Sequence, residues 1–167
     1  MTLPPALVQK LREVHDHADP WLDELAALIE KLEEQWNVRV TGLVDELSYH
    51  VVAFAEAADG TPYILKMGPP NPESLQEIRA LEYYDGDGIC CLIAAEPEAV
   101  AMLLERVQPG VSLWKVEDDE LATHACADLL SQLWRPVEDA SNFRSLESWT
   151  SARPEHFERY PQSGPLS

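Results

Sequence analysis

Two residues of opposite charge, Lys66 and Glu77, have the types and the spacing needed to hold a nucleotide. Lys66 lies near the end of a predicted strand, residues 61–67, and Glu77 lies on the helix predicted next, residues 72–84. On a helical wheel Glu77 falls within the apolar arc of that helix, where a carboxylate is costly unless a cation pairs with it. We therefore expect an ion pair, although both side chains could instead simply reach water. An ammonium group held in this way could bind the α- and β-phosphates of a nucleotide.

A second candidate is the end of the apolar run at residues 100–104. The run continues into Glu105-Arg106-Val107 and breaks at Pro109-Gly110. The backbone N–H and C=O groups of Glu105, Arg106 and Val107 could meet the edge of a purine while apolar side chains enclose its ring. The alternative is an ordinary edge strand followed by a turn.

The loop between the first two predicted strands, residues 45–50, would cover the phosphates of such a nucleotide. It contains no glycine, so a glycine-rich cradle is absent, and Asp45 and Glu46 would repel an anion. The hydroxyl of Ser48 and the backbone amides near it could still donate hydrogen bonds to phosphate. Ser48 is therefore also a candidate.

Hydrophobic periodicity predicts the elements that position these residues. Residues 1–37 repeat at helical spacing in two helices, the second with Asp19 as N-cap and Pro20 as first helical residue. The period then changes to two, with the tight-turn pair Asp59-Gly60 between the second and third strands. The three strands of this meander lie at about residues 38–43, 51–55 and 61–67.

After the meander, Asn71 is predicted to cap the helix at residues 72–84. Two further strands and two helices follow, at residues 89–95, 99–105, 121–133 and 146–152. This order predicts an α+β fold: five antiparallel strands with one inserted helix, as in the N-terminal lobe of a protein-kinase-like fold. We expect a helical segment (1–37), the small lobe with its hinge (38–110), and the first helices of an incomplete C-terminal lobe (111–167).

Composition excludes some partners. Twelve lysines and arginines against 30 aspartates and glutamates give a formal charge of −18, which disfavours nucleic acid and anionic membranes. The same charge would attract a cationic ligand, although ordinary solubility explains it equally well. Three cysteines form no disulfide framework or zinc motif, and no apolar run reaches the length of a membrane span. We expect a cytoplasmic protein.

Several stretches are specific enough to compare with a known family, above all Lys66-Met67-Gly68-Pro69-Pro70-Asn71-Pro72-Glu73. With residues 21–25, 59–65, 77–81, 103–110 and 133–136, this run resembles the aminoglycoside phosphotransferases of the streptomycin 6-kinase and hydroxyurea-resistance branch. The resemblance implies a kinase-like fold and transfer of the γ-phosphoryl group of ATP, with magnesium, to a hydroxyl of an aminoglycoside such as streptomycin, which confers antibiotic resistance. It also implies that Lys66 holds the phosphates, Glu77 is its partner, and Glu105 to Val107 form the hinge.

The sequence departs from that family in one large respect. It contains no His-Gly-Asp, so no catalytic aspartate and no metal-binding residue can be assigned. We expect an ATP-binding lobe that is inactive as this chain alone, with apolar surface exposed from the hinge through helix 121–133 and therefore prone to self-association. The alternative is a non-catalytic, kinase-like binding or scaffold domain without nucleotide affinity.

Overall fold

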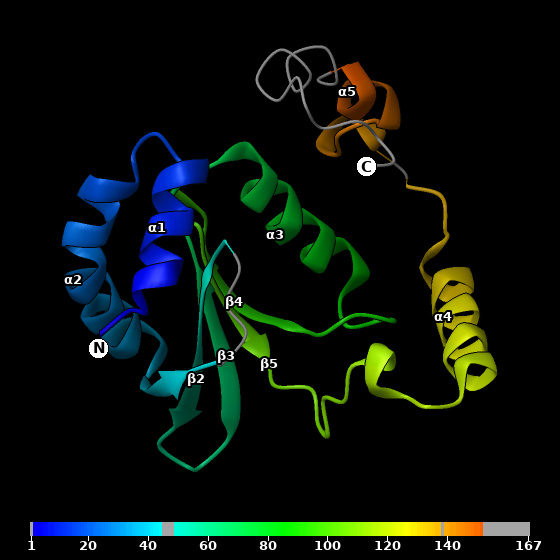
Figure 1. The fold of residues 1–167 in the computed structure, drawn as a ribbon, viewed down its shortest axis with the longest axis horizontal. Helices are drawn as coiled ribbons and strands as arrows, with labels where there is room; N and C mark the ends of the chain where they lie inside the picture. The colour runs from blue at the N-terminus through cyan, green and yellow to red at the C-terminus, as the bar shows by residue number, and fades with distance from the viewer. Residues whose placement is uncertain (1, 45–48, 138, 152–167) are drawn as a thin grey trace. The chain divides into compact units, whose positions relative to one another are not determined.

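The computed structural model describes residues 2–44, 49–137 and 139–151 (Figure 1). The chain divides into two compact units, Met1–Trp134 and Arg135–Ser167. The first unit contains α1 (Pro5–Val14), α2 (Ala18–Trp36), β1 (Val38–Leu43), β2 (Val51–Ala57), β3 (Pro62–Met67), α3 (Pro72–Tyr84), β4 (Leu92–Glu96), η1 (Pro97–Ala99), β5 (Ala101–Glu105), η2 (Leu113–Lys115) and α4 (Asp119–Leu133). The second unit contains η3 (Ala140–Asn142) and α5 (Leu146–Ser151). No helix in the described ranges is long and apolar enough to cross a membrane.

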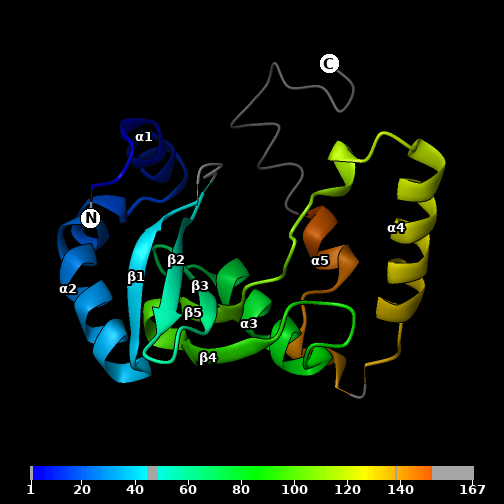
Figure 2. The same ribbon diagram turned by 90° about the horizontal axis from the view of Figure 1, so that it is seen from below.

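The five strands form one antiparallel sheet in the order β1-β2-β3-β5-β4 (Figure 2). The first three strands are a meander, and α3 is inserted before the last two. The predicted α+β fold is confirmed, with two helices before the sheet and further helices after it. Strands β3 and β5 have partners on both sides, so a residue on either strand is held by two neighbours.

Helix α3 begins where the sequence predicts. The Asn71 side chain accepts a hydrogen bond from the backbone N–H of Ser74 at 2.9 Å, which satisfies one of the free donors of the first turn. Pro72 occupies a position where its missing N–H costs nothing. The helix ends at Tyr84, because the C-cap residue Asp85 has a φ of 48° and stops the helical hydrogen-bond pattern.

The predicted start of α2 is wrong by two residues. The helix begins at Ala18 after His17, and the carboxylate of Asp19 lies 2.7 Å from Nε of Arg12 in α1 instead of capping. Pro20 is then the third helical residue, which is tolerated because the first four N–H groups of a helix have no partner inside it.

The last two strands are shorter than predicted. They cover Leu92–Glu96 and Ala101–Glu105, with a 3-10 turn at Pro97–Ala99 between them. Val100 has a φ of 49°, and its N–H closes the turn by donating to the carbonyl of Pro97 at 3.2 Å. The chain therefore cannot pair as a strand before Ala101.

Both faces of the sheet are covered. Helices α1 and α2 lie on one face and α3 lies on the other (Figure 1). Side chains alternate between the faces, as the period of two requires. In β5, Ala101 and Leu103 pack toward α1 and α2, whereas Met102 and Leu104 pack toward α3.

Candidate functional site

The predicted ion pair between Lys66 and Glu77 is present. Nζ of Lys66 lies 2.5 Å from Oε1 of Glu77. The two side chains are 20% and 36% exposed, respectively, so the pair is half-buried and still open to a ligand. The ammonium of Lys66 is thus held in place, and the carboxylate of Glu77 partly neutralises its charge.

The sheet register places Lys66 on the face that α3 covers. Lys66 pairs with Val52 on β2 and with Met102 on β5, and cross-strand partners share a face. Met102 packs against α3, so the lysine points to the same side. Glu77 reaches it from the second turn of α3.

An apolar floor lies beside the lysine on the same face. Ile64 lies two residues before Lys66 on β3 and therefore on the same face. It pairs with Phe54 on β2 and with Leu104 on β5. Val52, Phe54 and Ile64 are half-buried, and such a surface can receive a flat aromatic ring. These residues were not predicted from the sequence. The signal was available, because the period of two places them on the same face as Lys66.

The predicted hinge begins at Glu105, the last residue of β5. The N–H of Glu105 donates to the carbonyl of Cys91 at 2.9 Å, and its carboxylate accepts from the N–H of Cys91 at 3.1 Å. The guanidinium carbon of Arg106 lies 4.4 Å from the centre of the Phe54 ring, a cation–π contact. Val107 is exposed. The side chains of Glu105 and Arg106 and the N–H of Glu105 are thus engaged in contacts within the protein.

The candidate Ser48 lies outside the described residues. His50, which ends the same loop, is described, and its Nε2 lies 3.2 Å from Oγ of Ser74 in α3. Burial and the nearby charge of Lys66 lower the pKa of His50 below its usual value. His50 was not predicted from the sequence, since a single histidine at the end of a loop carries no signal of its own.

The family described as aminoglycoside/hydroxyurea antibiotic resistance kinase matches residues 35–159, which include the whole sheet and α3. This chain belongs to that family.

Curated relatives of this kinase family match over much of the chain. The streptomycin 6-kinase of Streptomyces glaucescens is 30% identical over 129 residues, 77% of this chain and 42% of the relative. The streptomycin 6-kinase of Streptomyces griseus is 33% identical over 113 residues, 68% of this chain and 37% of the relative. The hydroxyurea phosphotransferase of Kitasatospora aureofaciens is 30% identical over 115 residues, 68% of this chain and 34% of the relative. The match thus spans about two fifths or less of these kinases, and no solved structure matches the chain significantly.

A cavity of about 380 Å³ adjoins the ion pair of this family member. His15, His50, Asn71, Ser74 and Glu77 are among the residues that line it. It lies at the first two turns of α3, on the side of the loop that precedes β2. Val14 and Tyr49 add apolar surface to this lining, so titratable and apolar groups meet in the cavity.

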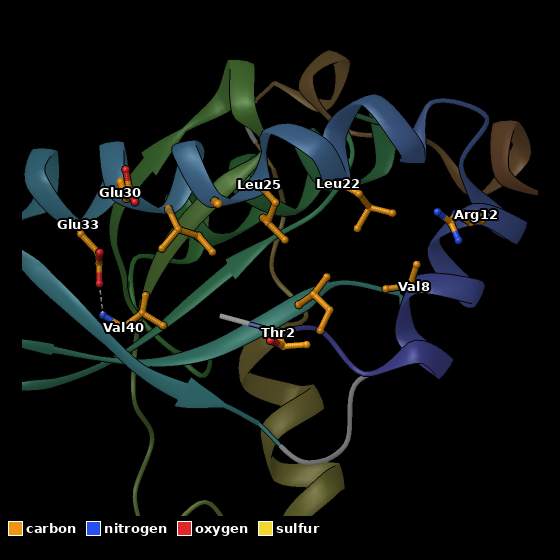
Figure 3. Close-up of a pocket in the computed structure, with 11 residues that line it drawn as sticks. Thr2, Val8, Arg12, Leu22, Leu25, Glu30, Glu33 and Val40 are labelled. Carbon is orange, nitrogen blue, oxygen red and sulfur yellow. Dashed lines mark hydrogen bonds between the residues drawn. The ribbon is translucent and has the colours of Figure 1, made fainter.

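A larger cavity, of about 550 Å³, lies on the opposite face of the sheet, between α1, α2 and β1 (Figure 3). Leu22, Leu25 and Val40 are part of its apolar lining, and a carboxylate oxygen of Glu33 accepts from the N–H of Val40 at 2.7 Å. None of the residues predicted to bind nucleotide lines it. We therefore assign it no part in the nucleotide site.

The residues at this site match the chemistry of ATP, but they do not define a metal site. Lys66 provides a cation for phosphates, and the half-buried floor beside it could accept a purine. Within the described ranges, no three or more His, Cys, Asp or Glu side chains group as metal ligands would. We assign no residue to magnesium.

Proposed function

We propose that residues 38–110 bind ATP as the nucleotide-binding lobe of a small-molecule kinase. In this proposal Lys66 holds the α- and β-phosphates, Glu77 orients Lys66, and the backbone of Glu105 to Val107 meets the purine edge. The observation that carries the proposal is the 2.5 Å pair between Lys66 and Glu77. Membership of a kinase family supports it, because phosphoryl transfer from a nucleotide depends on this type of pair.

Physical chemistry favours a nucleotide at this place despite the charge of −18. The long-range field repels phosphate, but it is screened beyond about 10 Å at 0.1 M salt. Close to the sheet, the fixed ammonium of Lys66 and the apolar floor of Phe54 and Ile64 act locally. A ligand with an anionic end and a flat apolar end matches both.

The acceptor in this proposal is a hydroxyl group of a cationic small molecule such as an aminoglycoside. Two relatives are streptomycin 6-kinases, which supports a cationic aminoglycoside as the acceptor. The third is a hydroxyurea phosphotransferase, and it supports only a small molecule with a hydroxyl group. An acidic protein also attracts an aminoglycoside over a distance. The sequence contains no His-Gly-Asp, so we propose that this chain alone binds ATP without transferring its phosphoryl group.

Calorimetric titration with Mg-ATP tests the proposal. Lys66→Ala should weaken binding by about 10- to 100-fold, the effect of losing a hydrogen bond to a charged group. Lys31→Ala is the matched control, because Lys31 is an exposed lysine of α2 whose Nζ lies 3.9 Å from the carboxylate of Glu96. It should leave the Kd unchanged, and circular dichroism should show that both variants are folded.

Two outcomes would overturn the proposal. If the wild type binds Mg-ATP no better than Lys66→Ala does, nucleotide binding through Lys66 is wrong and the chain is a non-catalytic kinase-like domain. If the chain alone transfers the γ-phosphoryl group of ATP to streptomycin, the proposed inactivity is wrong.

A further inference from the structure

His50 makes close contact with two neighbouring elements. It directly precedes β2, and its Nε2 lies 3.2 Å from Oγ of Ser74 on α3. Its ring also lies against the segment after β3, because a Cβ added at Gly68 would come within 2.9 Å of Cδ2 of His50. The imidazole thus occupies the space that a side chain at position 68 would need.

The hydroxyl that His50 contacts belongs to the N-terminal network of α3. Ser74 is 2% exposed, and its Oγ accepts from Nδ2 of Asn71 at 2.9 Å. Nδ2 of Asn71 also donates to the carbonyl of Pro69 at 2.9 Å, while its Oδ1 caps the N–H of Ser74. The first turn of α3 is therefore tied both to residues 68–71 and to the imidazole.

The same turn determines where Glu77 lies. Ser74 and Glu77 are three residues apart on one helix, so they share a face. A shift of the first turn would move the Glu77 carboxylate relative to Nζ of Lys66 on β3. The position of His50 is in this way coupled to the ion pair through a partly buried hydrogen bond.

The charges that face His50 come from three elements. Lys66 on β3 and His15 after α1 oppose its protonation, whereas Glu77 and Glu73 on α3 favour it. Burial is the largest influence, and the balance lowers the pKa of His50. A protonated imidazole would place a second cation beside Lys66 and compete for Glu77.

We propose that neutral His50 is a positioning residue of the nucleotide site, which holds the first turn of α3 through Ser74 so that Glu77 meets Lys66. This inference rests on the proposed function, because an effect of His50 on the Kd for Mg-ATP requires that the site binds a nucleotide. His50 itself need not touch the nucleotide, because it acts through Ser74 and α3.

The first test compares two substitutions of His50 by the Kd for Mg-ATP at about pH 8 and about pH 5.5. His50→Phe keeps a ring against Gly68 but loses the hydrogen bond, and it should weaken binding about 3- to 10-fold at the higher pH. His50→Gln can still hydrogen-bond Ser74 and should stay within about twofold of the wild type there. Acidification should weaken the wild type more than His50→Gln, because only the wild type can protonate at this position.

The second test moves the ring without replacing it. Gly68→Ala should weaken Mg-ATP binding, because its Cβ must displace His50. Gly42→Ala on β1 is the matched control, since a Cβ there has no atom within 4 Å. In a His50→Ala background the obstacle is gone, and Gly68→Ala should then have no further effect.

Hydrogen exchange at the Ser74 amide separates this inference from the proposed function, because it needs no nucleotide. His50→Phe should speed exchange there, and His50→Gln should not. If the wild type binds no Mg-ATP but exchange changes as expected, the proposed function fails and the coupling of His50 to α3 stands. If Lys66→Ala weakens binding while His50→Phe changes neither the Kd nor the exchange, or if the wild type and His50→Gln share one pH profile, the positioning role of His50 is overturned.

Discussion

At the scale of single residues, the Lys66–Glu77 pair matters more for orientation than for stability. Both side chains keep part of their surface in water, where an ion pair contributes at most about 1 kcal/mol to folding. A phosphate that reaches Lys66 nevertheless meets an ammonium whose position is already restricted. The conformational entropy of that side chain is therefore lost on folding, so its loss does not weaken binding.

His50 gives a prediction about stability and pH. Its folded-state pKa lies below 6.5, so the unfolded chain binds a proton there that the folded chain resists. The stability from neutral His50 is therefore fully present above about pH 6.5 and is lost as the pH falls from there toward the lowered folded pKa. We expect the free energy of unfolding of the wild type, measured in urea, to fall more between about pH 7.5 and about pH 5 than that of His50→Gln.

The His50→Gln variant is its own control, because all other titrating groups are shared with the wild type. An equal loss of stability in both proteins over this range would contradict the prediction. So would a greater loss in the variant, which would indicate a folded-state pKa raised by Glu73 and Glu77.

At the scale of elements, helices α3 and α4 are both capped by a side chain but differ in what their caps support. Asn71 caps α3, which buries Ser74, Ile78 and Leu81, whereas Asp118 caps α4, in which no described residue is buried. A cap on a packed helix is coupled to the core, and a cap on an exposed helix stabilises little beyond its own first turn.

Substitution of the two caps tests this difference. Asn71→Ala should lower the free energy of unfolding by about 1 kcal/mol and also weaken Mg-ATP binding, because Glu77 lies in the second turn of the same helix. Asp118→Ala removes a comparable hydrogen bond, from the N–H of Leu121 at 3.0 Å, and should change global unfolding by less than about 0.5 kcal/mol. Equal losses in urea unfolding would show that α4 is as much a part of the cooperative core as α3.

At the scale of the whole molecule, net charge and exposed apolar surface act in opposite directions. The charge of −18 keeps copies apart, whereas large apolar side chains after the hinge and on α4 favour association. Trp114 is 73% exposed and Leu130 is 57% exposed. Salt screens the repulsion but leaves the apolar attraction in place.

We therefore predict self-association that increases with ionic strength. Light scattering over a wide concentration range should give a higher average mass at about 500 mM than at about 20 mM NaCl. The double substitution Trp114→Ser and Leu130→Ser should reduce that mass, whereas Val14→Ser, at an exposed apolar residue of α1, should not. A monomer at every concentration and salt level would contradict the prediction.

The sequence by itself determined the order of elements and the central pair. When one face is buried, apolar residues repeat every 3.6 residues in a helix and every two residues in a strand, so their spacing distinguishes the two. The helical spacing also places Glu77 inside an apolar arc. Asn71 caps α3 as its residue type predicts, since the hydrogen bond is local. The start of α2 was predicted less well, because Asp19 pairs with Arg12 across an interhelical turn that local propensity does not describe.

Only the tertiary structure decided which residues surround Lys66. The floor of Phe54 and Ile64 follows from strand register, and the stacking of Arg106 on Phe54 follows from the pairing of β5 with β3. His50 contacts Ser74 across 24 positions of the chain, and its lowered pKa arises from burial and from Lys66. Such contacts depend on how separate segments pack, and neither the type of one residue nor its spacing to the next carries that information.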